Sequence, residues 1–199
     1  MTLVRYYIAL FLIIAIPSAL LLWLLIHPFV RFWRRLGPVR TYGLVGVVLA
    51  LAMAGVFRVR RYLLAVEFGA NYGLLVLGLC FLGAAIVLRL WHRRYMKTGT
   101  MFGLPKLDPK QYPGWLITAG PYAWVRHPRY VQVTLALWGF AFIANYLAVY
   151  GLAVLWMAGI YVIMLLEENE LRQRFGAAYE DYSRRVPRFV PRIRWHRSR

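Results

Sequence analysis

Two short segments hold the polar side chains that could take part in chemistry. The first is Arg126-His127-Pro128-Arg129-Tyr130, and the second is Glu167-Glu168-Asn169-Glu170. Carboxylates, an imidazole and a phenol can hydrogen-bond a polar ligand and balance its charge. Each segment also has a simpler interpretation. The arginines would anchor a membrane helix, the glutamates would form a solvated helix end, and His127-Pro128 would begin a helix.

Several other kinds of chemistry lack their residues in this sequence. Cys80 is the only cysteine, which excludes an intrachain disulfide and a multi-cysteine metal site. The four histidines, at positions 27, 92, 127 and 196, do not have the spacing of metal ligands. No glycine-rich phosphate loop follows a strand, and no Ser-His-Asp set suggests itself. The sequence therefore assigns no catalytic residue.

Membrane helices must position the two polar segments. Hydrophobic residues make up 61% of the 199 residues and charged residues 16%, which is far from the composition of a soluble domain. A helix needs about 20 apolar residues to cross a bilayer. Four stretches of 25, 17, 21 and 37 residues lack Asp, Glu, Lys and Arg: Tyr6–Val30, Thr41–Phe57, Phe68–Leu88 and Tyr130–Leu166. We expect the first three to cross once each, the first being too long for a cleaved signal peptide.

The fourth stretch is too long for one crossing. A turn at Asn145 would divide it into a helical hairpin, whose short first arm must begin near Pro128 or lie tilted. The total is then five membrane helices. Because a hairpin brings its two ends together, the segment 126–130 should lie close to Glu167 and Glu168.

The basic residues indicate how the helices are oriented. A net charge of +18 would suggest a nucleic-acid partner for a soluble protein, but here the basic residues lie between apolar runs, so we predict none. Five crossings place 21 Lys and Arg residues on the side of the C-terminus and 4 on the other side. The positive-inside rule then predicts an external N-terminus and a cytoplasmic C-terminus. In a prokaryote the membrane would be the cytoplasmic membrane.

The sequence predicts one all-α, polytopic membrane domain over residues 1–199. Residues 1–95 would form three membrane helices, and residues 96–199 a loop, the hairpin and a cytoplasmic tail helix. The tail shows apolar residues on one helical face at Leu171, Phe175, Tyr179 and Tyr182. We expect the last membrane helix to continue into this amphipathic helix until Pro187 stops it.

Two longer motifs in the C-terminal half extend the polar segments. One is Gly120-Pro121-Tyr122-Ala123-Trp124-Val125-Arg126-His127-Pro128-Arg129-Tyr130; the other is Glu167-Glu168-Asn169-Glu170-Leu171, followed by Phe175-Gly176, Tyr179, Tyr182 and Val186-Pro187-Arg188. Together they resemble the C-terminal half of the isoprenylcysteine carboxyl methyltransferase family, which is related to the phospholipid N-methyltransferases. The resemblance spans residues 116–191, with the same hairpin length between the motifs.

This resemblance implies an integral-membrane enzyme that uses S-adenosylmethionine in a pocket on the cytoplasmic side. Carried over by position, the cofactor contacts would be Gln111, Trp115, Leu116, Ile117, Tyr122, His127, Pro128, Tyr130 and Glu167. The aromatic faces of Tyr122 and Tyr130 would stabilise the positive sulfonium. Glu167 would accept hydrogen bonds from the ammonium or ribose of the cofactor, and His127 would hydrogen-bond the cofactor rather than act as a base.

Two departures from the family bear on the substrate. Gln132 stands where the family usually has glycine, and Ile163 stands where the animal prenylcysteine enzymes have an arginine associated with the substrate carboxylate. We expect both positions to face the substrate. A carboxylate acceptor would have no arginine partner at position 163. The expected acceptor is therefore a lipid or lipophilic small molecule, such as a lipid amine or a thiol.

Two alternatives stay open at this point. One is an NADPH-dependent membrane enzyme like the sterol reductases, which share related C-terminal motifs but have many more spans than 199 residues allow. The other is a basic, non-enzymatic membrane interaction protein, which would leave the two motifs unexplained.

Overall fold

The computed structural model describes residues 2–26, 28–95 and 115–191, and most of these residues are in helices. Glu67 and Tyr146 form an isolated β-bridge there. The helices are α1 (Thr2–Ile26), α2 (Val30–Leu36), α3 (Pro38–Leu63), α4 (Tyr72–Arg93), η1 (Gly120–Ala123), α7 (Pro128–Ala144), α8 (Leu147–Phe175) and α9 (Ala177–Arg185). The predicted all-α class is confirmed.

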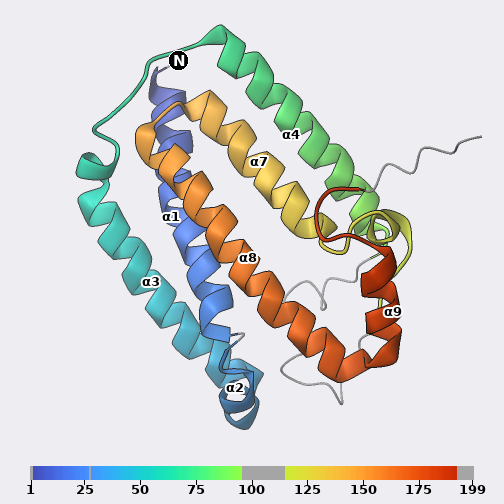
Figure 1. Cartoon of the computed structure of the whole chain (residues 1–199). Coiled ribbons are helices and arrows are strands. Elements are labelled where there is room, and N and C mark those ends of the chain that lie inside the picture. The colour runs from blue at the N-terminus through green and yellow to red at the C-terminus, as the bar shows by residue number, and fades with distance from the viewer. Residues whose placement is uncertain (1, 27, 96–114, 192–199) are drawn as a thin grey trace, which may run out of the picture.

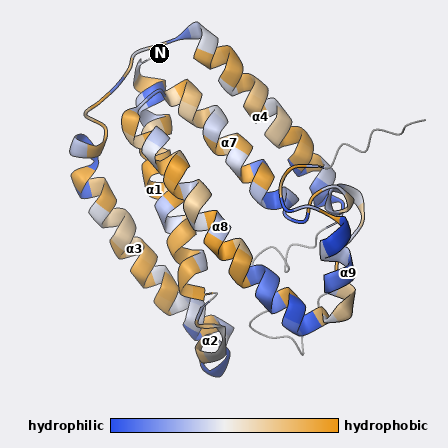
Figure 2. Ribbon diagram, in the orientation of Figure 1, coloured by the Kyte–Doolittle hydropathy of each residue, from blue (hydrophilic) through white to orange (hydrophobic). Residues whose placement is uncertain are grey.

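Five helices lie where the five spans were predicted, and the crossing by the shortest of them stays a prediction. Four of them, α1, α3, α4 and α8, are long and apolar enough to cross a membrane. The fifth, α7, has 17 residues and begins at Pro128, as expected for the short arm of the hairpin. Figure 2 shows apolar residues over the middle of these helices and hydrophilic residues over the lower part of α8 and over α9. This is the pattern of a polytopic membrane protein.

The bundle core lies where α1, α7 and α8 meet. α1 packs against α3, α7 and α8, while α4 packs along α7, so α3 and α4 lie on opposite flanks (Figure 1). Leu137 of α7 and Val149 and Ile160 of α8 are buried in this core. Most side chains of α3 and α4 are exposed, as expected for helices that face lipid.

Two glycines let α4 and α7 approach closely. A Cβ added at Gly78 would lie 2.7 Å from the carbonyl oxygen of Gly139, and a Cβ added at Gly139 would lie 2.9 Å from the carbonyl oxygen of Gly78. Small residues at a crossing allow two membrane helices to pack backbone against backbone. The crossing fixes α7, whose first turn carries Tyr130, against α4.

Substitution of Gly139 tests this crossing. We expect Gly139→Val to push α4 away from α7 and to destabilise the protein by about 1–3 kcal/mol, as overpacking does. Thermal unfolding of the detergent-solubilised protein measures the loss. Gly83→Val on α4 is the matched control, because a Cβ there meets nothing within 4 Å. A Gly139→Val protein as stable as the Gly83→Val protein would contradict the close contact.

The hairpin turns at Asn145, as predicted. Asn145 has a left-handed backbone (φ 56°) and ends α7. Its carbonyl oxygen accepts a hydrogen bond from the Phe68 amide at 3.0 Å. Beside it, Arg5 forms an ion pair with Glu67 at 2.7 Å and donates from Nε to the Ala144 carbonyl oxygen at 3.0 Å. These contacts fasten the turn to α1 and to the connection between α3 and α4.

The tail helix differs from the prediction of one continuous helix. α8 ends at Phe175, and Gly176 separates it from α9 with φ 52° and ψ −128°, a conformation that only glycine adopts readily. The apolar spacing across this point stays helical, so periodicity does not reveal the break. The break turns α9 back beside η1 (Figure 1), where the Tyr182 hydroxyl donates to the Tyr122 carbonyl oxygen at 2.8 Å.

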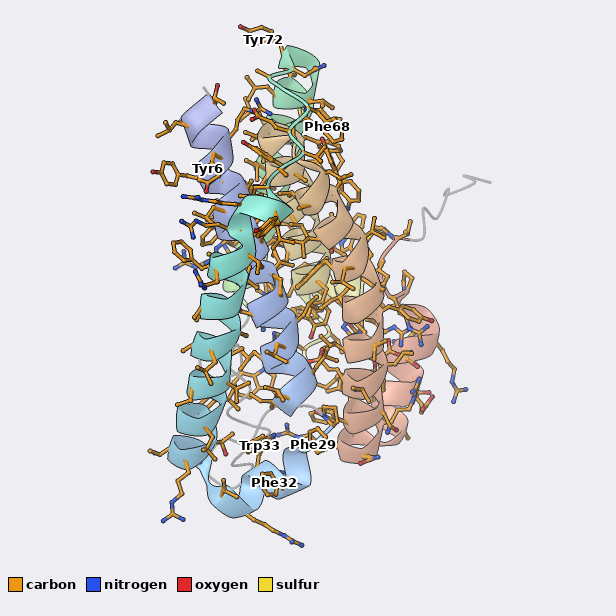
Figure 3. The ribbon with its side chains drawn as sticks, turned by 90° about the vertical axis from the view of Figure 1, so that its left-hand side faces the viewer. Tyr6, Phe29, Phe32, Trp33, Phe68 and Tyr72 are labelled. Carbon is orange, nitrogen blue, oxygen red and sulfur yellow. The ribbon has the colours of Figure 1, made fainter. Side chains whose placement is uncertain are left out.

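Aromatic side chains mark the two ends of the bundle. Tyr6, Phe68 and Tyr72 lie toward one end, and Phe29, Phe32 and Trp33 lie around α2 at the other (Figure 3). Aromatic residues gather in this way at the two surfaces of a membrane. The α2 end is also the end toward which α9 lies (Figure 1), so the basic residues of α2 and those of α9 share one side.

The orientation of this end relative to the membrane stays a prediction. We expect a reporter fused after the last residue to be active as a cytoplasmic probe and silent as an external one, because the charge bias favours a cytoplasmic C-terminus. A fusion at the N-terminus should show the opposite pattern. External activity of the C-terminal fusion would contradict the expected orientation.

Candidate functional site

Glu168 on α8 is the centre of a buried ionic cluster. Its side chain has no exposed surface. Oε1 lies 3.0 Å from Arg126 Nη1 and 3.1 Å from His127 Nε2. Arg188 donates from Nε to Oε1 and from Nη2 to Oε2, each at 3.0 Å, and Arg172 approaches Oε2 at 3.6 Å from a more exposed position. A carboxylate removed from water needs such partners to remain ionised.

The C-terminal tail completes this cluster through backbone contacts. The Arg126 amide donates to the Pro187 carbonyl oxygen at 2.8 Å, and the His127 amide donates to the Arg188 carbonyl oxygen at 3.3 Å. The tail after α9 therefore runs along the segment that precedes α7 and brings the Arg188 guanidinium to Glu168. The hydrogen bonds to Glu168 raise the pKa of Arg188 above its ordinary value.

A second group of polar side chains lies on the other side of His127. The Tyr130 hydroxyl donates to Glu167 Oε2 at 2.7 Å, and the His127 and Tyr130 rings stack with centroids 5.6 Å apart. His127 Nδ1 lies 4.0 Å from Glu167 Oε2. Because the Glu168 carboxylate accepts at Nε2, we assign the proton of a neutral His127 to that nitrogen, which leaves Nδ1 as an acceptor.

Local backbone geometry places Tyr122 beside these groups. Gly120 has φ 61°, and an added Cβ would overlap the Tyr95 ring, so the motif needs glycine there. The helical turn η1 that follows carries Tyr122, whose carbonyl oxygen is held by Tyr182. Burial and the negative charge of Glu167 raise the pKa of Tyr122, and burial raises that of Tyr182. Both phenols are therefore protonated at neutral pH.

The structure confirms that the two polar segments meet, and it corrects the placement of Arg126. The interpretation of the arginines as membrane anchors does not apply to Arg126, because its side chain is 10% exposed and pairs with Glu168. Arg129 lies with its guanidinium carbon 5.4 Å from the centre of the Trp23 ring. Neither Glu168 nor Arg188 has a role predicted from the sequence, although Arg188 belongs to one of the two motifs that resemble the family.

The other predicted site residues are distributed more widely. Gln111 lies outside the described residues. Trp115 is exposed, and Leu116 and Ile117 are half-buried; Leu116 packs on a small cluster formed by α9. Pro128 is buried at the start of α7.

The two positions assigned to the substrate differ in their burial. Gln132, in the second turn of α7, is half-buried. Ile163 has no exposed surface and lies in the main core. The contact of Ile163 with a substrate stays a prediction; in this structure the side chain is enclosed by the packing of the bundle.

The part of the chain that holds most of these residues is similar to a known protein family. A family model described as phospholipid methyltransferase matches residues 74–178, which is more than half of the chain. The match runs from α4 into α9 and includes both polar segments. No solved structure matches the chain.

Three curated proteins are similar to parts of the chain. The cobalt-zinc-cadmium resistance protein CzcN of Cupriavidus metallidurans is 31% identical over 63% of this chain and 52% of its own length. The nickel-cobalt-cadmium resistance protein NccN of Alcaligenes xylosoxydans is 32% identical over 42% of this chain and 39% of its own. Methanethiol S-methyltransferase 2 of Bradyrhizobium diazoefficiens is 44% identical over 36% of this chain and 27% of its own. The chain thus spans about half, or less, of the relatives it matches.

The names of the first two relatives raise the question of a metal site. The described residues contain no group of three or more His, Cys, Asp or Glu side chains that could hold a metal ion. Glu168, the most buried carboxylate of the site, is instead paired with guanidinium groups.

Proposed function

Since the chain belongs to the phospholipid methyltransferase family, we propose that it is an integral-membrane methyltransferase that uses S-adenosylmethionine. Its acceptor would be a lipid or a lipophilic small molecule. The observation that carries the proposal is the convergence of Tyr130 and His127 on Glu167 and Glu168, at the hydrophilic end of an otherwise apolar bundle.

The residues at this end fit the chemistry of the proposed cofactor. Its sulfonium supplies an already activated methyl group, so the protein need only bind, align and exclude water. Glu167 offers a carboxylate to the cofactor ammonium or to its ribose hydroxyls, and His127 Nδ1 offers a further acceptor. The neutral rings of Tyr122 and Tyr130 offer aromatic faces to the positive sulfonium.

The ionic cluster would support this site without contacting the cofactor. Glu168 fixes the imidazole of His127 through Nε2, and Arg126 and Arg188 hold Glu168 in turn. Such a shell keeps a binding side chain in one rotamer, which is required for an aligned methyl transfer. Trp115, Leu116 and Ile117 precede η1, and together with Pro128 and Gln111 they stay proposed cofactor contacts by resemblance.

The proposed acceptor is uncharged or cationic. Ile163 provides no positive charge for a substrate carboxylate, and burying an unpaired carboxylate is costly. The similarity to a protein named methanethiol S-methyltransferase 2 favours a thiol among the neutral candidates. An amine-bearing lipid is the other candidate, and it agrees with the name of the family. Gln132 stays a proposed substrate contact.

Photocrosslinking and methyl transfer test this proposal together. Purified protein in detergent should crosslink to labelled S-adenosylmethionine under ultraviolet light and should not crosslink to labelled NADPH. Membranes containing the protein, incubated with methyl-labelled S-adenosylmethionine, should release label into a lipid or a volatile product. Crosslinking to NADPH would support the reductase alternative, and crosslinking to neither would support a non-enzymatic role.

A further inference from the structure

His92 is a buried histidine that has no role in the proposed function. It lies in the last turn of α4, and its side chain is 5% exposed. Neither ring nitrogen makes a hydrogen bond of good geometry among the described residues, although the backbone of Arg89, one turn earlier, lies close to the ring. Buried polar side chains nearly always have a hydrogen-bond partner, and a native exception calls for an explanation such as a catalytic role or a missing ligand.

The surroundings of His92 connect it to the proposed cofactor site. Its ring centre lies 6.1 Å from that of Tyr122 on η1, and the two planes are 31° apart. Beside this pair, Trp91 of α4 contacts Trp124 edge-to-face at 6.5 Å, which holds α4 against the segment that follows η1. Tyr122 also interacts electrostatically with Glu167. His92 is thus adjacent to an aromatic ring that we assign to the cofactor.

The charges around His92 favour a neutral imidazole. The charged groups that face it are Arg89 from its own helix and Arg129 from α7, while η1 contributes the protonated phenol of Tyr122. No carboxylate in the described part of the chain is among them. A neutral imidazole keeps one nitrogen with a free lone pair, and this nitrogen is an available proton acceptor next to the cofactor site.

We infer that His92 hydrogen-bonds the X–H group of the methyl acceptor, where X is the atom that becomes methylated, and takes the proton that methyl transfer releases. The inference rests on the proposed function and applies to an acceptor with a transferable proton, such as a thiol. In the transfer, the lone pair of X forms the new bond to the methyl carbon. The carbon–sulfur bond breaks and its electrons stay on sulfur, which becomes a neutral thioether. The X–H proton passes to the free nitrogen of His92.

The test separates binding of cofactor, binding of acceptor and transfer. The variant is His92→Ala, and the matched control is Leu90→Ala, an exposed residue in the same turn. The acceptor probes are 1-octanethiol, 1-octanol and phosphatidylethanolamine in detergent. We expect His92→Ala to bind S-adenosylmethionine as the wild type does. Its rate of methyl transfer, measured with whichever probe the wild type methylates, should fall by about 10²–10⁴-fold, as on loss of a general base.

Two further readouts distinguish a proton acceptor from a packing residue. The wild-type rate should fall as the pH is lowered and His92 becomes protonated, and this acid limb should be absent from the residual rate of His92→Ala. Calorimetry without cofactor should show about two- to tenfold weaker binding of the accepted probe, as expected for one lost hydrogen bond. Added imidazole should restore part of the rate to His92→Ala. If His92→Ala does not fold, His92→Gln provides the same measurements, since glutamine cannot take the proton.

Several outcomes would overturn the inference. Unchanged transfer by His92→Ala, or loss of S-adenosylmethionine binding in the same variant, would each remove the assigned role. If the wild-type protein binds S-adenosylmethionine but methylates none of the three probes, the proposed class of acceptor is wrong. Failure of the wild type to bind S-adenosylmethionine would instead overturn the proposed function itself.

Discussion

Replacement of Glu168 by glutamine is expected to destabilise the protein by about 3–5 kcal/mol, which is the cost of removing one partner from a buried ion pair. Glu168 is fully buried and pairs with Arg126, His127 and Arg188. Without its charge, the buried Arg126 guanidinium loses its counter-ion. We expect a melting temperature in detergent that is several degrees lower, measured by the fraction of protein that remains monodisperse after heating.

Two matched variants separate this effect from general damage to α8. Asn169→Ala changes the exposed neighbour of Glu168 and should leave the melting temperature unchanged. Arg172→Gln removes a partner that is 41% exposed, so it should cost no more than about 1 kcal/mol. If Glu168→Gln is as stable as Asn169→Ala, the cluster is not what holds the tail against the bundle.

The second large effect is expected on binding of S-adenosylmethionine. Glu167→Ala removes the carboxylate that accepts the Tyr130 hydroxyl and that we assign to the cofactor. A lost charged hydrogen bond is worth about 1.5–3 kcal/mol, so the dissociation constant should rise roughly tenfold to hundredfold. Calorimetry on the purified protein measures the change. Because the buried Tyr130 hydroxyl also loses its acceptor, the melting temperature of the unliganded protein should fall, but by less than in Glu168→Gln.

His127→Ala provides a different pattern from Glu167→Ala. His127 contacts Glu168 through Nε2 and lies 4.0 Å from Glu167 through Nδ1. Its loss should weaken cofactor binding by a similar factor and also lower the melting temperature. Unchanged affinity in both variants would contradict the assignment of these residues to the cofactor, while leaving the structural role of Glu168 intact.

The order of the long apolar helices follows from the sequence. Charge-free stretches of the length of a bilayer leave few alternatives to membrane helices, and Asn145 offers a turn in the only stretch that is too long. A hairpin returns the chain to the side from which it started. The meeting of the segment 126–130 with Glu167 and Glu168 was therefore predictable, because it depends on topology rather than on the packing of particular side chains.

Tertiary structure decides which side chains point inward. Glu167 and Glu168 are adjacent on α8 and differ by about 100° of rotation around the helix, so only the packing of α8 determines that Glu168 is fully buried while Glu167 contacts Tyr130. The same holds for Arg188. It reaches Glu168 because the tail pairs with the backbone of Arg126 and His127, and each of these two hydrogen bonds joins residues 61 positions apart.

The break at Gly176 and the enclosure of Ile163 and His92 also come from tertiary structure. Gly176 interrupts a pattern whose apolar spacing stays helical, because the direction of α9 is set by its contact with η1 rather than by periodicity. Ile163 and His92 lie on membrane helices, where apolar composition is similar on all sides and does not distinguish a lipid-facing position from a buried one. The sequence by itself determined which segments are apolar enough to be candidate membrane helices and that the two polar segments meet. The rotation of each helix, and with it the set of side chains that share the site, was decided by side-chain packing.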